Sequence, residues 1–256
     1  MDEDPRLLEI FLDVQCGLPR QGPGCDESTL RALSLCRGLP ARPAVLDIGC
    51  GPGMQTVALA KACDGLITAV DVFQEYLDAL QVRAEAAGVA ERVKTLTADM
   101  SSLPFGPESF DLIWAEGSAY IMGFETALVA WRRFLRPAGC IAVSELTWLR
   151  PDPPAEVAEF FASEYPAMAD VETNVETVRQ CGYEPLGQFT LPDAAWWEHY
   201  YTPLAAKLPT LRERYVGDDA ALGIIATTER EIDMRRRFGD WYGYAFFVGR
   251  FPANAD

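Results

Sequence analysis

The sequence predicts an α/β fold in which helices cover both faces of a doubly wound, mainly parallel sheet. Short apolar runs suited to buried strands alternate with segments of helical periodicity between residues 44 and 146. The first run ends at Ile48 and leads into Gly49, Gly51 and Gly53, a tight turn that lets the backbone approach a ligand. Acidic residues stand at or just past the ends of four runs, which is the ligand-binding edge of such a sheet.

Two helices are expected before the sheet. Apolar residues recur at helical spacing over residues 6–18, where a glycine and a proline end the helix. A loop at 20–24 leads to a second helix, which Asp26 or Ser28 can cap and Gly38 ends.

Strands and helices then alternate along the chain. The expected strands cover 44–48, 66–71, 93–97, 110–115 and 140–146. The expected helices cover 54–63, 73–87 and 125–135, with a turn at 137–139 before the fifth strand.

The character of the chain changes after residue 150. A proline-rich break is followed by two helical pieces over 155–181, a sixth strand at 183–191 and a last strand at 241–249. The segment 192–240 between these strands is an insertion rich in aromatic side chains.

Charge and cysteine usage narrow the class of protein. The chain holds 22 Lys and Arg against 38 Asp and Glu, so its net charge of −16 disfavours nucleic acids and anionic membranes as partners. The N-terminus lacks the positive start of a signal peptide, and no run approaches the ~18 apolar residues of a membrane span. Seven scattered cysteines and one histidine predict reduced thiols, no metal site and a cytoplasmic location.

The acids at the strand ends suggest a particular ligand. Asp71 ends the second strand, where a carboxylate can accept hydrogen bonds from both hydroxyls of a ribose. Asp99 follows the third strand and can receive an adenine amino group, while Asp47 can fix the glycine turn or hold an ammonium group. A ligand with ribose, adenine, a cationic amino-acid end and no phosphate fits this edge, and S-adenosylmethionine has those parts.

Several motifs together resemble a known family. Residues 45–53, 69–71, 97–105, 110–114 and 135–139 are similar to those of class I S-adenosylmethionine-dependent methyltransferases, of the small-molecule type found in ubiquinone and menaquinone biosynthesis. The flanking segments resemble a poorly characterised bacterial branch. The resemblance implies a seven-stranded Rossmann-like sheet whose last strand is antiparallel, with S-adenosylmethionine as cofactor and S-adenosylhomocysteine as product.

The chain is expected to form one domain, residues 1–256, with four parts. Residues 1–40 form a helical cap and 41–150 the cofactor-binding core. Residues 151–191 and 241–256 complete the sheet, and 192–240 form an insertion on the substrate side.

The resemblance assigns cofactor contacts by position, and it supplies no fixed catalytic residue. Asp47, Gly49 and Gly51 border the methionine part; Asp71 holds the ribose; Val72 or Phe73 lies against the adenine; Asp99 and Met100 read the adenine edge; Glu116 lies near the sulfonium. In the loop before the sheet, Gly22 permits close approach, and Arg20 can pair with the cofactor carboxylate or with nearby acids.

The acceptor side of the site is expected in the insertion and beside Glu116. Methyl transfer needs alignment and exclusion of water, and it needs a base only if the acceptor arrives protonated. The candidates for that base are Glu116, Glu145 and His199, with Tyr120 close to the first. The expected acceptor contacts, which can wall a flat or cationic molecule or simply pack the insertion on the sheet, are Tyr120, Trp148, Trp196, Trp197, His199, Tyr200 and Tyr201.

Two other functions fit parts of the pattern. A nicotinamide-dependent oxidoreductase uses a similar sheet, although its third glycine comes one residue later. A non-catalytic S-adenosylmethionine-binding protein would share the glycine turn. The partners expected for the methyltransferase are a small-molecule acceptor and a second copy of the chain in a homodimer.

Overall fold

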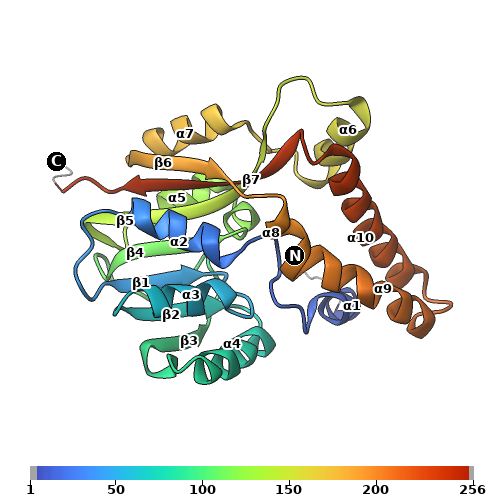
Figure 1. Cartoon of the computed structure of the whole chain (residues 1–256), viewed down its shortest axis with the longest axis horizontal. Coiled ribbons are helices and arrows are strands. Elements are labelled where there is room, and N and C mark those ends of the chain that lie inside the picture. The colour runs from blue at the N-terminus through green and yellow to red at the C-terminus, as the bar shows by residue number, and fades with distance from the viewer. Residues whose placement is uncertain (1–4, 254–256) are drawn as a thin grey trace.

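A computed structural model describes residues 5–253; the expectations for residues 1–4 and 254–256 lie outside this range. Its centre is a seven-stranded sheet in the order β3-β2-β1-β4-β5-β7-β6 (Figure 1). The strands are β1 (Ala44–Ile48), β2 (Leu66–Asp71), β3 (Val93–Thr97), β4 (Phe110–Glu116), β5 (Leu135–Trp148), β6 (Glu184–Thr190) and β7 (Tyr242–Arg250). The pairs among β1–β5 are parallel, and β7 runs antiparallel to both β5 and β6. The predicted doubly wound sheet with a reversed last strand is confirmed.

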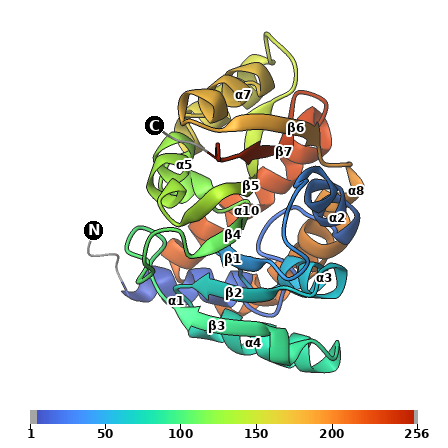
Figure 2. The same ribbon diagram turned by 90° about the vertical axis from the view of Figure 1, so that its left-hand side faces the viewer.

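Helices pack on both faces of the sheet (Figure 2). One face carries α2 (Asp26–Leu35), α3 (Met54–Ala62) and α4 (Gln74–Ala86), with the short η1 (Ala90–Arg92) after them; the other carries α5 (Phe124–Arg132) and α7 (Val171–Gln180). Side chains of β1 alternate between two buried clusters, since Val45 joins the cluster under α3 whereas Leu46 and Ile48 join the cluster under α5. Burying each such side chain contributes about 1.5–3 kcal/mol.

A third group of helices gathers past the carboxyl ends of the parallel strands (Figure 1). It comprises α1 (Pro5–Gln15), α6 (Ala155–Glu164), α8 (Ala194–Trp196), η3 (Trp197–Tyr201), α9 (Thr202–Arg214) and α10 (Asp219–Phe238). The first helix packs against α9 and α10, and Lys207 of α9 donates to the backbone oxygens of Asp13, Val14 and Cys16 at 3.0, 2.8 and 2.5 Å. A cation at a helix carboxyl end satisfies orphan carbonyls, so the N-terminal helix is fixed to the insertion.

The boundary between α5 and β5 differs from the sequence prediction. The helix ends at Arg132 rather than at 135, and the strand begins at Leu135, so the predicted turn at 137–139 lies inside β5. Ala138 has a φ of +64°, and the register with β4 shifts between Phe110 and Leu112. The Pro137-Ala138-Gly139 segment, predicted to be a turn, is therefore a bulge within β5, and the strand continues past Ala138.

Two further observations concern the described residues. Within residues 5–253, no helix combines the length and the apolar character needed to cross a bilayer. The seven cysteines all have free thiols.

Candidate functional site

The glycine turn after β1 is shaped by its neighbours. The amides of Gly49 and Cys50 donate to the carbonyl of Val70 at 2.8 and 3.0 Å, which ties the turn to β2. Gly49 and Gly53 have φ of +70° and +77°, and a Cβ there would lie 2.5 Å from Ser118 and 2.2 Å from Leu80. Glycine is therefore required at both positions for conformation and for space. The turn delivers the first amides of α3 to the edge of the sheet.

Asp71 is held rigidly at the end of β2. Its Oδ2 accepts from the amide of Gly51 at 2.9 Å, and its Oδ1 accepts from the amide of Phe73 at 3.1 Å. Burial raises the pKa of this carboxyl, and the two amides oppose the rise. A carboxylate oxygen has more than one acceptor position, so each oxygen can still receive a hydroxyl from the cavity that Asp71 lines.

Asp47 lies beneath the turn instead of in the cavity. Its side chain is fully buried, and its Oδ2 accepts from the Thr56 hydroxyl at 2.6 Å. Burial, with a smaller effect of Glu116, raises its pKa to about 7. Gln55, whose Nε2 lies 3.5 Å from Oδ2 of Asp47, donates to the carbonyl of Cys50 at 2.7 Å and lines the cavity. The structure thus gives Asp47 the first of its two expected tasks, supporting the turn, and does not bring it to a ligand's ammonium group.

Glu116 and Arg20 form a buried ion pair. Nη1 of Arg20 donates to Oε2 of Glu116 at 2.8 Å, and both side chains are 4% exposed. Oε1 of Glu116 accepts from the Thr29 hydroxyl at 2.7 Å and from the Trp114 indole at 2.9 Å. Oε1 already accepts from two donors, and protonation of Oε2 would break the ion pair with the buried Arg20, so Glu116 is poorly placed to take a proton from an acceptor. The structure therefore does not support the expected general-base role, and the pair instead fastens the loop at 20–24 to the end of β4.

Arg20 keeps one donor unused. Its Nε is buried and makes no hydrogen bond with the described residues, while Nη2 contacts Asp26 at 3.5 Å. Arg20 lines the cavity together with Gly22, where a Cβ would meet no atom within 4 Å. The loop therefore covers the glycine turn with one free cationic donor and an unobstructed backbone.

Of the three residues that follow β3, two line the cavity and one does not. Asp99 is exposed, and its Oδ1 accepts from the amide and hydroxyl of Ser101, both at 2.7 Å, which lowers its pKa. Met100 and Ala98 line the cavity, and the Met100 carbonyl accepts from the indole of Trp131 at 3.1 Å. The structure does not bring Asp99 to the cavity, because its carboxylate caps its own loop.

A cavity of about 360 Å³ joins these residues to the helical insertion. Of the expected site residues, those that line it are Arg20, Gly22, Gly49, Gly51, Asp71, Val72, Phe73, Met100, Glu116, Tyr120, Trp196, Tyr200 and Tyr201. This volume lies within the range of small-molecule sites.

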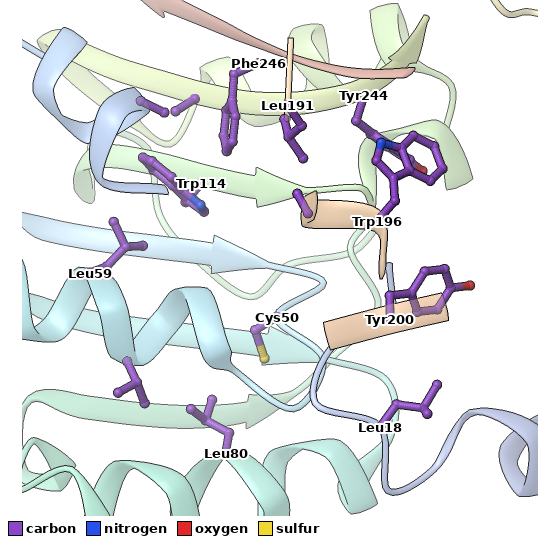
Figure 3. Packing of buried hydrophobic residues seen from close by; sticks show 14 of the residues in the cluster. Leu18, Cys50, Leu59, Leu80, Trp114, Leu191, Trp196, Tyr200, Tyr244 and Phe246 are labelled. Carbon is purple, nitrogen blue, oxygen red and sulfur yellow. The ribbon is translucent and has the colours of Figure 1, made fainter. Parts of the chain in front are cut away.

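One half of the cavity has an aromatic wall, consisting of Phe161, Trp196, Tyr200, Tyr201, Tyr242 and Tyr244. The rings are contiguous: Trp196 lies 5.8 Å from Tyr242 and 5.5 Å from Tyr244, and Tyr200 stacks on Tyr201 at 4.8 Å between centroids. Figure 3 shows Trp196, Tyr200 and Tyr244 grouped past the ends of the parallel strands. The wide π-helical turn of η3 brings two consecutive tyrosines to the cavity.

Three expected acceptor contacts lie away from the cavity lining. Trp148 packs edge-on against Phe161 at 5.7 Å, and the Trp197 indole donates to Asp193 at 3.0 Å. The side chain of His199 is 28% exposed and lies 3.7 Å from that of Glu198. Consecutive residues of a helical turn face different directions, so only part of the aromatic segment 196–201 can reach the site.

Sequence reasoning missed several lining residues. Tyr242 and Tyr244 alternate along the last strand and therefore share one face, a signal that was available. Glu231 of α10 also lines the cavity, and its Oε1 accepts from the Tyr201 hydroxyl at 2.6 Å. No local pattern singled it out, because it lies in a charged stretch that resembles an ordinary exposed helix face.

Glu145 of β5, the third candidate base, is a buried carboxyl group outside the cavity lining. It is 1% exposed, and neither of its oxygens makes a hydrogen bond with the described residues. Burial raises its pKa to about 7, and the nearby Tyr165 hydroxyl opposes only part of the rise.

Glu145 should make stability depend on pH. Its pKa is higher folded than unfolded, so between pH 4.5 and 7 the folded protein binds the extra proton and stability falls as the pH rises. Glu145→Gln cannot ionise, so it removes the loss of stability that accompanies ionisation of the buried Glu145. Urea unfolding should show equal stabilities below pH 4.5 and an advantage of about 3 kcal/mol for the variant at pH 8. A constant difference across this range would contradict the buried, unpaired state of Glu145.

Comparison with known proteins identifies a methyltransferase domain within the chain. Residues 45–139 match the family model described as a methyltransferase domain. The 27-O-demethylrifamycin SV methyltransferase of Amycolatopsis mediterranei is 29% identical over 82% of this chain and 78% of its own length. Methyltransferase GfsG of Streptomyces halstedii is 31% identical, over 40% of this chain and 37% of its own length.

Solved structures share the fold along nearly the whole chain. A methyltransferase from Geobacter sulfurreducens and another from Thiobacillus denitrificans, both in complex with S-adenosyl-L-homocysteine, superpose with TM-scores of 0.80 at 21% identity. Each match covers 97% of this chain and 99% of the solved one. These comparisons give no support to the oxidoreductase alternative. Together, the family match, the relatives and the shared fold support a class I S-adenosylmethionine-dependent methyltransferase of the small-molecule type.

Proposed function

We propose that this chain transfers the methyl group of S-adenosylmethionine to a small acceptor bound against the aromatic wall, an activity of class EC 2.1.1.-. The observation that carries the proposal is the continuity of the cavity, which joins the glycine turn and Asp71 to the aromatic wall. A cofactor at one end can then present its methyl group directly to an acceptor at the other. A protein that only bound the cofactor would need no such second half.

The cofactor half divides among the lining residues as follows. Asp71 accepts the ribose hydroxyls, and the amides after Gly49 and Gly51 border the methionine part. Val72, Ala98 and Met100 enclose the adenine, a role that takes the place of the one expected for Asp99. The free Nε donor of Arg20 meets the cofactor carboxylate. Glu116 acts as a positioning residue, since it orients Arg20 through its ion pair.

The acceptor half of the cavity aligns the acceptor with the methyl group and excludes water. Six aromatic residues exclude water and give an apolar acceptor a shaped surface, which favours an in-line displacement at the activated methyl group. Tyr120 lies at this half and can orient an acceptor through its hydroxyl. We place neither His199, Trp197 nor Trp148 in contact with the acceptor.

The proposal extends to the cellular location of the protein, its partners and the division of its domain. A bacterial cytoplasm suits the free thiols, and the net charge of −16 argues against nucleic-acid partners. We retain residues 41–150 as the cofactor core and 192–240 as the acceptor-side insertion of one domain. A homodimer remains part of the proposal.

The test is release of S-adenosylhomocysteine from S-adenosylmethionine in the presence of fractionated metabolite extracts, with mass spectrometry of the methylated product. We expect at least one fraction to support turnover by the native chain and none to support turnover by Tyr200→Ala, which opens the aromatic wall. Tight binding of S-adenosylmethionine without turnover in any fraction would instead support a binding protein.

A further inference from the structure

The acceptor half of the cavity has an unusual charge balance. The aromatic wall surrounds one carboxylate, Glu231, and the only cation among the described lining residues is Arg20, which is already paired with Glu116. An anionic acceptor would therefore find no uncommitted positive partner in this half of the cavity. Aromatic faces, in contrast, attract cations through their quadrupoles.

Glu231 forms no ion pair with the residues that the structure describes. Its Oε1 accepts from the Tyr201 hydroxyl. Burial raises its pKa, and the nearby Glu164 adds to the rise. The side chain is partly exposed, toward the cavity that it lines, so a ligand there can supply the missing counter-charge.

A second buried carboxyl group reinforces this field. Glu145 makes no hydrogen bond with the described residues, and its charge acts together with that of Glu231 on two tyrosines that line the cavity. Burial raises the pKa of Tyr244, which is 9% exposed, and both carboxylates add to the rise. The same two carboxylates act to raise the pKa of Tyr120, whose side chain is 44% exposed. When ionised, these two carboxylates make the potential around Tyr120 and Tyr244 negative, which favours a cation and repels an anion. Arg235, whose guanidinium carbon lies 4.1 Å from the Trp196 ring centroid, is itself paired with Asp193 at 2.7 Å.

We propose that the aromatic wall and Glu231 form a subsite for a cationic group of the acceptor, a protonated or quaternary amine. The amine lies against the rings, and the carboxylate of Glu231, oriented by Tyr201, provides its counter-charge. Such a subsite presupposes the proposed function, since it names the class of acceptor. It concerns recognition of the cationic group and leaves the methylated atom free to be another part of the molecule.

The experiment compares two probes of the same shape. Choline carries a quaternary ammonium, and 3,3-dimethylbutan-1-ol replaces its nitrogen with carbon. Calorimetric titration of the protein saturated with S-adenosylhomocysteine should show choline binding about tenfold tighter than the alcohol. Equal binding of the two probes, or no saturable binding of choline at tens of millimolar, would overturn the cationic subsite.

Three variants identify the residue responsible. Glu231→Gln keeps an acceptor for Tyr201 but removes the charge, so the preference for choline should fall to about twofold or less. Tyr201→Phe keeps the charge and should retain most of the preference. Glu213→Gln, at an exposed position of α9 away from the cavity, should behave as the native protein does. A choline preference that survives Glu231→Gln would contradict the assignment.

Cofactor titrations separate this result from other outcomes. Unchanged affinity for S-adenosylhomocysteine shows that each variant is folded, and failure of the native chain to bind it would refute the proposed function instead. If Glu231→Gln weakens S-adenosylmethionine alone and leaves the choline preference intact, the carboxylate serves the cofactor's sulfonium, and the acceptor subsite is wrong.

Discussion

Replacing Glu116 with glutamine is expected to lower the free energy of unfolding by about 3–5 kcal/mol, the usual effect of removing one partner from a buried ion pair. The substitution leaves the buried Arg20 guanidinium without its counter-charge, and it can place an amide donor against another donor. Urea unfolding of the protein without cofactor measures the change directly.

Two controls isolate the ion pair. The double variant Arg20→Met with Glu116→Gln removes both charges and should be less destabilised than the sum of the single changes, by about 1–3 kcal/mol. Glu156→Gln breaks an exposed pair with Arg237 and should change stability by about 1 kcal/mol or less. A Glu116→Gln protein of native stability that has lost turnover would return Glu116 to the role of general base.

Replacing Asp71 with alanine should weaken the binding of S-adenosylhomocysteine by about thirtyfold to a thousandfold, equivalent to about 2–4 kcal/mol. The proposed ribose hydrogen bonds are lost, and the Gly51 amide loses the acceptor that orients it. Calorimetric titration gives the affinity, and thermal unfolding without cofactor shows whether the glycine turn itself has been disturbed.

Asp99 provides the matched comparison for Asp71. It also follows a strand end, but its carboxylate is exposed and bonded to Ser101, so Asp99→Asn should leave affinity within about twofold of the native value. If Asp99→Asn weakens binding as strongly as Asp71→Ala, the loop at 99–101 closes onto the cofactor and the original expectation for Asp99 is restored.

The parts of the molecule that sequence predicted well depend on short-range signals. The strand, glycine turn and helix at 44–62 are contiguous, so periodicity and glycine spacing were enough to place them. The reversed order of the last two strands could not be predicted from such short-range signals. It followed from the family resemblance, since no local pattern in β6 or β7 reveals which neighbour a strand will choose.

The site residues that sequence misjudged depend on distant partners. Glu116 resembled a free carboxylate at a strand end, yet its partners Arg20 and Thr29 lie 96 and 87 positions earlier in the chain. Glu231 became a lining residue only because α10 packs across the end of the sheet and turns one acid of a charged helix inward. Such pairings arise from tertiary packing, which single-sequence periodicity does not encode.

The antiparallel pairing of β6 with β7 has an evolutionary and practical consequence. Everything between Thr190 and Tyr242 departs from one strand and returns on its hydrogen-bonded neighbour, so the ends of the insertion are held together by the sheet itself. The cost of closing such a loop grows only slowly with its length. Segments of other lengths and sequences can therefore be exchanged between these two strands while the cofactor core keeps its shape. Selectivity for new acceptors should thus be obtainable by grafting whole insertions, with less disruption than point changes around the glycine turn.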